Sequence, residues 1–99
     1  MYLLVWEFRV PAARQADFER VYGADGDWVQ LFRRGAGYLG SELARDTADP
    51  LRYLTVDRWT AREAYDAFRA AHAADYGALD RSCEALTAAE TPIGAFLDV

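Results

Sequence analysis

β-Branched and aromatic residues follow one another from Tyr53 to Trp59, and apolar residues then recur at three- and four-residue steps as far as Leu86. The first pattern is typical of a β-strand, and the second predicts a long amphipathic helix over residues 61–86. Thr60 followed by Glu63 predicts a capping box at the helix start, because each side chain can bind the backbone N–H of the other residue. Gly77 is the expected point of interruption.

The rest of the chain predicts three more strands and an N-terminal helix. The strands are expected at residues 2–10, 38–45 and 91–97. A helix after Pro11 should break at residues 23–26, resume under a cap by Asp27 and stop at Gly35. Residues 47–50 form a turn that joins the second and third strands at hairpin distance, and Pro92 favours an edge position for the last strand.

The resulting element order is βαββαβ. This order consists of two βαβ halves, which normally form a four-stranded antiparallel sheet with both helices on one face. We therefore predict a ferredoxin-like α+β fold in a single domain of residues 1–99.

The first and third strands are apolar on both faces, which predicts a second copy of the chain. Helices can cover only one face of the sheet, and an exposed apolar face of several hundred Å² is unusual for a soluble monomer. Packing two sheets about a twofold axis would cover it, giving a homodimer. Charges on that face, from Glu7, Arg9 and Arg58, would then need partners across the interface.

Composition narrows the class of protein. With 53% apolar residues and no apolar run of about 18 residues, the chain should be globular and should not span a membrane. We expect no signal peptide, and a single cysteine fits a cytoplasmic location. The net charge of −5 argues against a nucleic-acid partner. We expect no metal or nucleotide, because the chain lacks a Gly-rich phosphate loop, a second histidine and a cysteine pair.

Candidate functional residues gather around the one histidine. His72 lies on the apolar stripe with Tyr65 and Phe68, and it is either a proton-transferring residue or a hydrogen-bonded core residue. Trp59 either contacts a ligand or packs the helix entry. Trp28, after the break in the first helix, either forms a lid over a pocket or packs in the core.

Three carboxylates on strands, Glu7, Glu42 and Asp57, are open to two interpretations. Each is either a partner in a structural ion pair or a general base. The ion-pair interpretation is the commoner one for such positions.

Strand one ending at Pro11, the Gly37–Leu43 strand and the Tyr53–Trp59 strand entering the helix of residues 60–68 resemble the antibiotic biosynthesis monooxygenase family. The resemblance covers nearly the whole chain. It implies a dimeric α+β barrel with a pocket in each subunit between sheet and helices. Relatives include cofactor-independent oxygenases of polyketide anthrones, quinol oxygenases, haem-degrading enzymes and proteins of no established activity, so the fold constrains the reaction only weakly.

The chain departs from these relatives because it contains no asparagine. Haem-degrading relatives combine an asparagine with a tryptophan and an axial histidine, of which only Trp59 and His72 have loose counterparts here. Anthrone oxygenases of the family also use asparagine and tryptophan to bind substrate and stabilise its carbanion. Tyr65, Tyr53 or an arginine would have to stabilise the oxyanion instead.

The resemblance implies a cofactor-independent monooxygenase that acts on a small aromatic or polyketide-like molecule. His72 would be the catalytic base, and Trp28, Tyr53, Trp59, Tyr65 and Phe68 would bind the substrate. The first alternative is a non-catalytic small-molecule-binding or stress-related accessory protein with the same pocket. The second alternative is haem binding or degradation.

Overall fold

The computed structural model describes all 99 residues. The strands are β1 (Tyr2–Arg9), β2 (Tyr38–Arg45), β3 (Arg52–Trp59) and β4 (Ala89–Leu97). The helices are α1 (Gln15–Tyr22), α2 (Asp27–Phe32), α3 (Arg62–Ala71) and α4 (Ala73–Ser82), with 3₁₀ turns at Ala12–Arg14 and Glu84–Leu86. The strand bounds lie within two residues of the sequence prediction.

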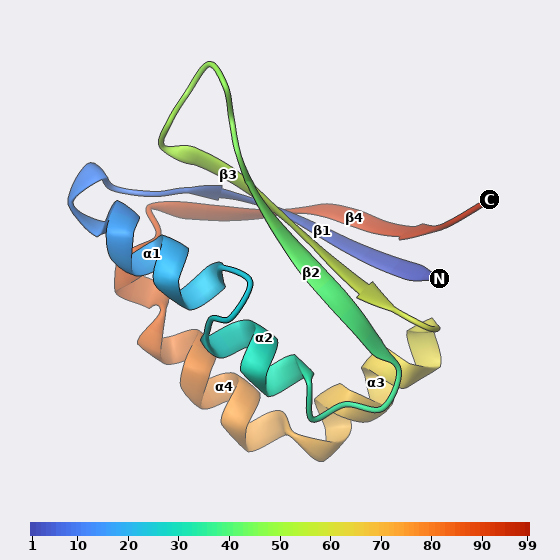
Figure 1. Cartoon of the computed structure of the whole chain (residues 1–99). Coiled ribbons are helices and arrows are strands. Elements are labelled where there is room, and N and C mark those ends of the chain that lie inside the picture. Colours follow the sequence, from blue (N-terminus) through green and yellow to red (C-terminus); the bar gives the residue numbers. More distant parts are fainter.

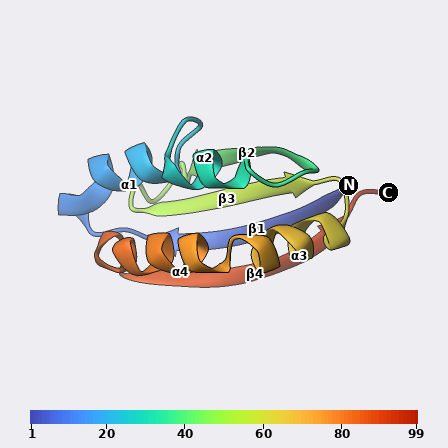
Figure 2. The same ribbon diagram turned by 90° about the horizontal axis from the view of Figure 1, so that it is seen from below.

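The four strands form one antiparallel sheet in the order β2-β3-β1-β4. All the helices lie on one face of it, as Figures 1 and 2 show. This arrangement confirms the predicted ferredoxin-like α+β fold. It also confirms that the last strand, which contains Pro92, lies at an edge.

The sheet face that meets the helices carries the aromatic residues of β1. Phe8 is buried in the core, and Tyr2, Leu4 and Trp6 pack against it. The helices and β3 complete the core, and the side chains of Phe18 and Trp59 are fully buried. The other members of the buried cluster are Val10, Val21, Tyr22, Trp28, Leu31, Phe32, Tyr53, Phe68 and Cys83.

The long C-terminal helix breaks at His72, and the predicted break at Gly77 is wrong. The backbone of His72 has φ −119° and ψ 28°, which ends α3 and precedes α4. The break allows α3 to contact β3 while α4 contacts α2, so both segments cover the core. Gly77 stays inside α4, where a glycine is tolerated at a modest cost.

Two predicted helix caps do not form. Ala61 is the N-cap of α3, because Thr60 still belongs to the sheet edge, where its N–H donates to Gly37 O at 2.8 Å. Gly26 takes the cap position of α2 in place of Asp27. A Cβ at residue 26 would lie 2.2 Å from Val21 O, so only glycine fits there. The predicted interruption between residues 22 and 27 is confirmed.

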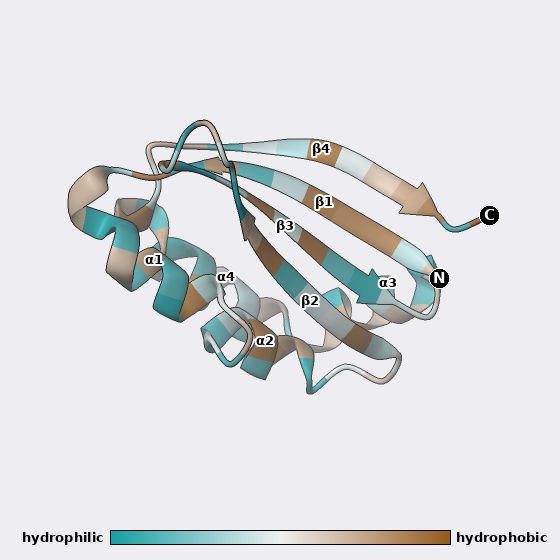
Figure 3. Cartoon of the chain, turned by 45° about the horizontal axis from the view of Figure 1, so that its top comes forward, coloured by the Kyte–Doolittle hydropathy of each residue, from teal (hydrophilic) through white to brown (hydrophobic).

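The opposite face of the sheet carries no helix. Its apolar residues alternate with the core-facing ones along the strands, and Figure 3 shows hydrophobic stretches on β1 and toward the end of β4. They include Leu3, Val5, Leu54, Val56 and Phe96. No helix of the chain has the length and apolar character needed to cross a membrane.

Charged residues on this open face find partners within the chain. Arg52 Nε donates to Glu7 Oε2 at 2.8 Å, and Arg58 Nη1 lies 2.8 Å from Glu42 Oε1. Arg9 likewise pairs with an aspartate of the β2–β3 turn. The expectation that these charges need partners across an interface is therefore wrong, because diagonal positions on adjacent strands already place opposite charges together.

Candidate functional site

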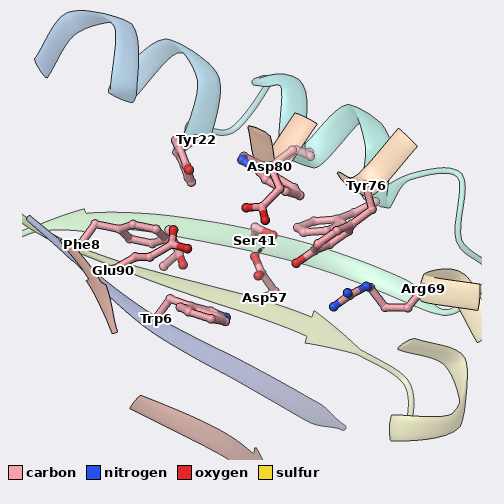
Figure 4. Close-up of a pocket in the computed structure, with 13 residues that line it drawn as sticks. Trp6, Phe8, Tyr22, Ser41, Asp57, Arg69, Tyr76, Asp80 and Glu90 are labelled. Carbon is pink, nitrogen blue, oxygen red and sulfur yellow. Dashed lines mark hydrogen bonds between the residues drawn. The ribbon is translucent and has the colours of Figure 1, made fainter. Parts of the chain in front are cut away.

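A cavity of about 270 Å³ lies between the helix-covered face of the sheet and the helices (Figure 4). Its volume is close to the lower end of the range for small-molecule sites, roughly 300–1,000 Å³. Aromatic walls surround a smaller number of polar groups. The lining residues are Trp6, Phe8, Tyr22, Trp28, Val29, Phe32, Ser41, Thr55, Asp57, Arg69, Tyr76, Asp80 and Glu90.

Ser41 and Asp57 form the polar centre of the cavity. They are register partners on β2 and β3, and both face the helices. Asp57 shares this face with Thr55 because alternate residues of a strand point to the same side. Figure 4 shows Ser41 and Asp57 next to each other in the middle of the pocket.

Asp57 is a carboxyl group with one hydrogen-bond donor and no ion-pair partner. Ser41 Oγ donates to Asp57 Oδ1 at 2.6 Å. Burial raises the pKa of Asp57 to about 6, and the Ser41 hydrogen bond opposes this effect only in part. Around neutral pH the group is therefore mostly ionised, yet it binds a proton more strongly than an exposed aspartate does. This is the property expected of a general base.

The pocket contains one cationic side chain, Arg69 of α3. Its guanidinium lies 3.8 Å from the ring centroid of Tyr76, and Arg69 Nη1 donates to Tyr65 Oη at 3.0 Å. Both contacts hold the guanidinium in place, and it forms no ion pair. Its remaining donors can bind a negatively charged oxygen of a ligand.

Two further carboxylates, Asp80 of α4 and Glu90 of β4, line the pocket. Burial raises the pKa of Glu90, and the nearby charge of Asp80 raises it further. In Figure 4, Glu90 lies close to Phe8, and Asp80 lies on the helix side above the centre of the pocket. The two carboxylates are exposed residues, in contrast to the carboxyl of Asp57.

Trp28 forms part of the pocket wall. Its side chain is 8% exposed, and the buried Nε1 has no acceptor. The Nε1 atom is buried away from the pocket surface, so the contribution of Trp28 to the pocket is the face of its ring. Trp59 Nε1 is also buried without an acceptor, but Trp59 does not line the pocket.

Among the catalytic and substrate-binding residues that the family resemblance implied, Trp28 is the one that lines this pocket. Trp59 and Phe68 are buried core residues whose rings lie 5.1 Å apart. Tyr53 is also in the core, where its hydroxyl donates to Glu19. Tyr65 reaches the pocket only through its hydrogen bond to Arg69.

His72 lies at the break between α3 and α4, outside the pocket lining. Its ring packs against Phe68 with a centroid distance of 5.3 Å. The predicted stripe placed His72 beside Phe68 correctly, but it assumed a continuous helix. The break at this residue turns α4, so that Tyr76 and Asp80 face the pocket in its place.

Sequence analysis identified one residue at the centre of the site but left its role open. Asp57 was recognised as either a general base or an ion-pair partner. Its position in phase with Tyr53, Thr55 and Trp59 places a carboxylate on the apolar face of the strand, and this phase identifies it as a residue of the helix-covered side. No sequence signal indicated Ser41 or Arg69, because their roles depend on strand register and on the turn of the helix.

The family model described as antibiotic biosynthesis monooxygenase matches residues 1–76. Comparison with curated proteins finds no similar sequence. Solved structures give strong matches over nearly the whole length. SnoaB, a cofactor-independent oxygenase from Streptomyces nogalater, is 23% identical, with 99% of this chain and 92% of that chain covered and a TM-score of 0.80.

Two other structures support the same fold. A protein from Bordetella bronchiseptica, assigned to the antibiotic biosynthesis monooxygenases, is 26% identical, with 99% of this chain and 96% of that chain covered and a TM-score of 0.76. A Pseudomonas aeruginosa protein, PA3566, is 17% identical, with 99% and 93% covered and a TM-score of 0.74.

Proposed function

The chain belongs to the antibiotic biosynthesis monooxygenase family, and we propose that it is a cofactor-independent monooxygenase of a small, electron-rich aromatic substrate. The observation that carries this proposal is the carboxyl of Asp57 at the centre of an aromatic pocket. Such a group can remove a proton from a weakly acidic C–H bond. The substrate itself then supplies the electrons that oxygen needs.

In the proposed reaction, Asp57 takes a proton from a methylene group that is conjugated with a carbonyl or phenol. The electron pair stays on the substrate, which transfers one electron to O₂ and then forms a C–O bond with the reduced oxygen. The peroxide takes up a proton from water, Asp57 removes the second C–H proton, and the O–O bond breaks as the departing oxygen takes up another proton. One oxygen atom becomes the new carbonyl of the product, and the other leaves as water.

The same pocket provides groups for the charge that develops on the substrate oxygen. Arg69 presents guanidinium donors that no ion pair occupies. Donors fixed in place before the reaction stabilise an oxyanion most effectively, because they need no reorganisation. The flat walls formed by Trp6, Phe8 and Phe32 suit an aromatic ring system.

We also propose that the protein is a homodimer formed through the open sheet face. Apolar residues alternate along β1 and β3 on this face, and their charged neighbours are already paired within the chain. The face can therefore be covered without burying unpaired charges. We expect the interface to bury more than roughly 1,200 Å² in total.

A non-catalytic binding protein would use the same aromatic pocket, and turnover separates the two functions. Haem binding is less well supported, because the single histidine lies outside the pocket lining and cannot offer an axial ligand there. Adding haemin and recording the Soret band would test it.

Oxygen uptake with an anthrone, dithranol, and with a panel of quinols tests the proposal. Asp57→Asn keeps the shape and the acceptor for Ser41 but removes the base, and we expect it to lower the enzymatic rate at least 100-fold. Asp80→Asn, which removes one carboxylate from the same pocket, is the matched control and should retain most of the rate. Tight binding of dithranol without any enzymatic oxygen uptake would contradict the proposal and favour a binding protein.

A further inference from the structure

A chain of hydrogen bonds crosses the wall between the pocket and a second hollow. Ser41 Oγ donates to Asp57 Oδ1 at 2.6 Å, and Tyr38 Oη lies 2.7 Å from Ser41 Oγ. Asp57 lines the pocket, Tyr38 lines the second hollow, and Ser41 lines both. The residues around the second hollow are Ala24, Val29, Arg33, Tyr38, Leu39, Gly40 and Ser41.

The backbone of β2 is built in an unusual way at this point. Residues three apart on a regular strand point to opposite faces, so Tyr38 and Ser41 would not meet. A register shift between Tyr38 and Gly40 inserts an extra residue and brings both side chains to the helix-covered face. Gly40 has φ +134°, a conformation that glycine adopts without strain, and a Cβ there would meet no atom within 4 Å.

We propose that Ser41 and Tyr38 form a proton-transfer route that carries the proton accepted by Asp57 from the pocket to water in the second hollow. This inference rests on the proposed function, because the single base Asp57 must release the first methylene proton before it can remove the second one. A carboxyl that has accepted one proton must lose it before the next turnover. The reacting substrate still fills the pocket between these two proton transfers, so a path through the pocket wall allows release without its departure.

Each step of the route moves one proton and breaks no other bond. Protonated Asp57 donates to Ser41 Oγ while the Ser41 proton moves to Tyr38 Oη, and the Tyr38 proton moves to a water molecule in the hollow. Rotation of the two hydroxyl groups restores the starting arrangement. The route transfers one proton from the substrate carbon to water, and the oxygenation later takes protons back from water, so a complete turnover releases no net proton.

Other charged and titratable groups face Asp57 or Tyr38, but none provides a competing path. No hydrogen bond or ion pair joins them to Asp57, whose one side-chain partner is Ser41. Arg33, which caps α2, lies near Tyr38 and favours the ionised form of its hydroxyl, whereas burial has the larger, opposite effect on the Tyr38 pKa. The groups around the pocket are Tyr22 of α1, Arg69 of α3, Tyr76 and Asp80 of α4, and Glu90 of β4.

Anaerobic hydrogen exchange of dithranol tests the route without oxygen chemistry. In D₂O, Asp57 removes a methylene proton, the route replaces it with deuterium from the hollow, and the deuterium returns to the carbon. Without the route the same proton returns, so exchange falls although the base remains. We expect Tyr38→Phe and Ser41→Ala to lower protein-catalysed exchange roughly tenfold or more, measured by ¹H NMR above the uncatalysed background.

Matched variants separate this effect from a general loss of structure. Ser41→Thr keeps the hydroxyl and should retain exchange. Tyr2→Phe removes a tyrosine hydroxyl from the same sheet face, outside both cavities, and should behave as the wild-type protein. A ¹³C titration of the Asp57 carboxyl provides a readout without substrate. Loss of the Ser41 donor should raise the pKa of Asp57.

The outcomes distinguish this inference from the proposed function. Oxygen uptake that depends on Asp57, combined with undiminished exchange in Tyr38→Phe, would overturn the route alone. An unchanged Asp57 pKa in Ser41→Ala would also overturn it. Exchange that depends on Tyr38, without oxygen uptake, would support the route and contradict the oxygenase. Wild-type protein that catalyses neither process would overturn both.

Discussion

Asp57→Asn should make the protein more stable at neutral pH while it removes activity. An exposed aspartate has a pKa of 3.8, and burial raises that of Asp57 to about 6 in the folded protein. Above pH 6 the folded state must therefore hold an ionised carboxyl that the unfolded chain accommodates more easily. Two pKa units, at about 1.4 kcal/mol each, correspond to about 3 kcal/mol of lost stability as an upper bound.

The direction of the pH dependence follows from proton binding. Between pH 4 and pH 6 the native state binds more protons at Asp57 than the unfolded state does, so the free energy of unfolding falls as the pH rises. Above pH 6 this contribution stays constant. Below pH 4 both states are protonated, and the penalty disappears. The asparagine variant carries no charge at residue 57 at any pH, and it keeps an oxygen acceptor for Ser41.

Urea unfolding of the two proteins between pH 4 and pH 7.5, at one protein concentration, measures the effect. We expect a stability difference near zero at pH 4 that grows to about 2 to 3 kcal/mol in favour of asparagine at pH 7.5. Asp80→Asn controls for the loss of one negative charge from the pocket. A difference that does not change with pH, or a less stable asparagine variant at pH 7.5, would refute the assignment of a buried, ionised carboxyl at Asp57.

Other predictions follow from the same structure. His72→Ala should retain turnover within about twofold because His72 lies outside the pocket, and it should lose about 1 kcal/mol of stability through the lost packing against Phe68. Loss of turnover in a folded variant would identify His72 as the base instead. Gly40→Ala should destabilise the protein by about 1 to 2 kcal/mol, measured in urea, because of the positive φ. Trp28→Ala should weaken dithranol binding in a calorimetric titration by about 1 kcal/mol or more through loss of an aromatic pocket wall; unchanged affinity would exclude that contact. Val56→Glu on the open sheet face should convert the dimer into monomers in sedimentation experiments, and a wild-type protein that sediments as a monomer at micromolar concentration would contradict the proposed interface.

The sequence predicted the fold well because the elements carry strong local signals. The strand bounds, the interruption at residues 23–26 and the edge position of the Pro92 strand all depend on hydrophobic spacing and on glycine or proline. The caps were harder to predict. Thr60 has the residue type of a cap, but it stays bonded to Gly37 at the end of the sheet, and this tertiary contact overrides the local preference.

The site was predicted less well because it depends on distant residues and on small backbone changes. Helical periodicity aligned His72 with Tyr76, whereas the break at residue 72 separates them. The pairing of Ser41 with Asp57 requires the bulge at Gly40, which shifts the register by one residue. Periodicity cannot detect a one-residue shift, although that shift decides which side chains face the pocket.

The most direct test of Asp57 as the base is the pH dependence of dithranol oxygenation. We predict that kcat/KM, corrected for the uncatalysed reaction, rises with pH through an apparent pKa of about 6, because only the ionised carboxyl accepts the substrate proton. This rise in kcat/KM should shift to higher pH in Ser41→Ala and should disappear in Asp57→Asn. A value of kcat/KM that does not change between pH 5 and pH 8, or a rise that persists unchanged in Asp57→Asn, would contradict a role for Asp57 as the base.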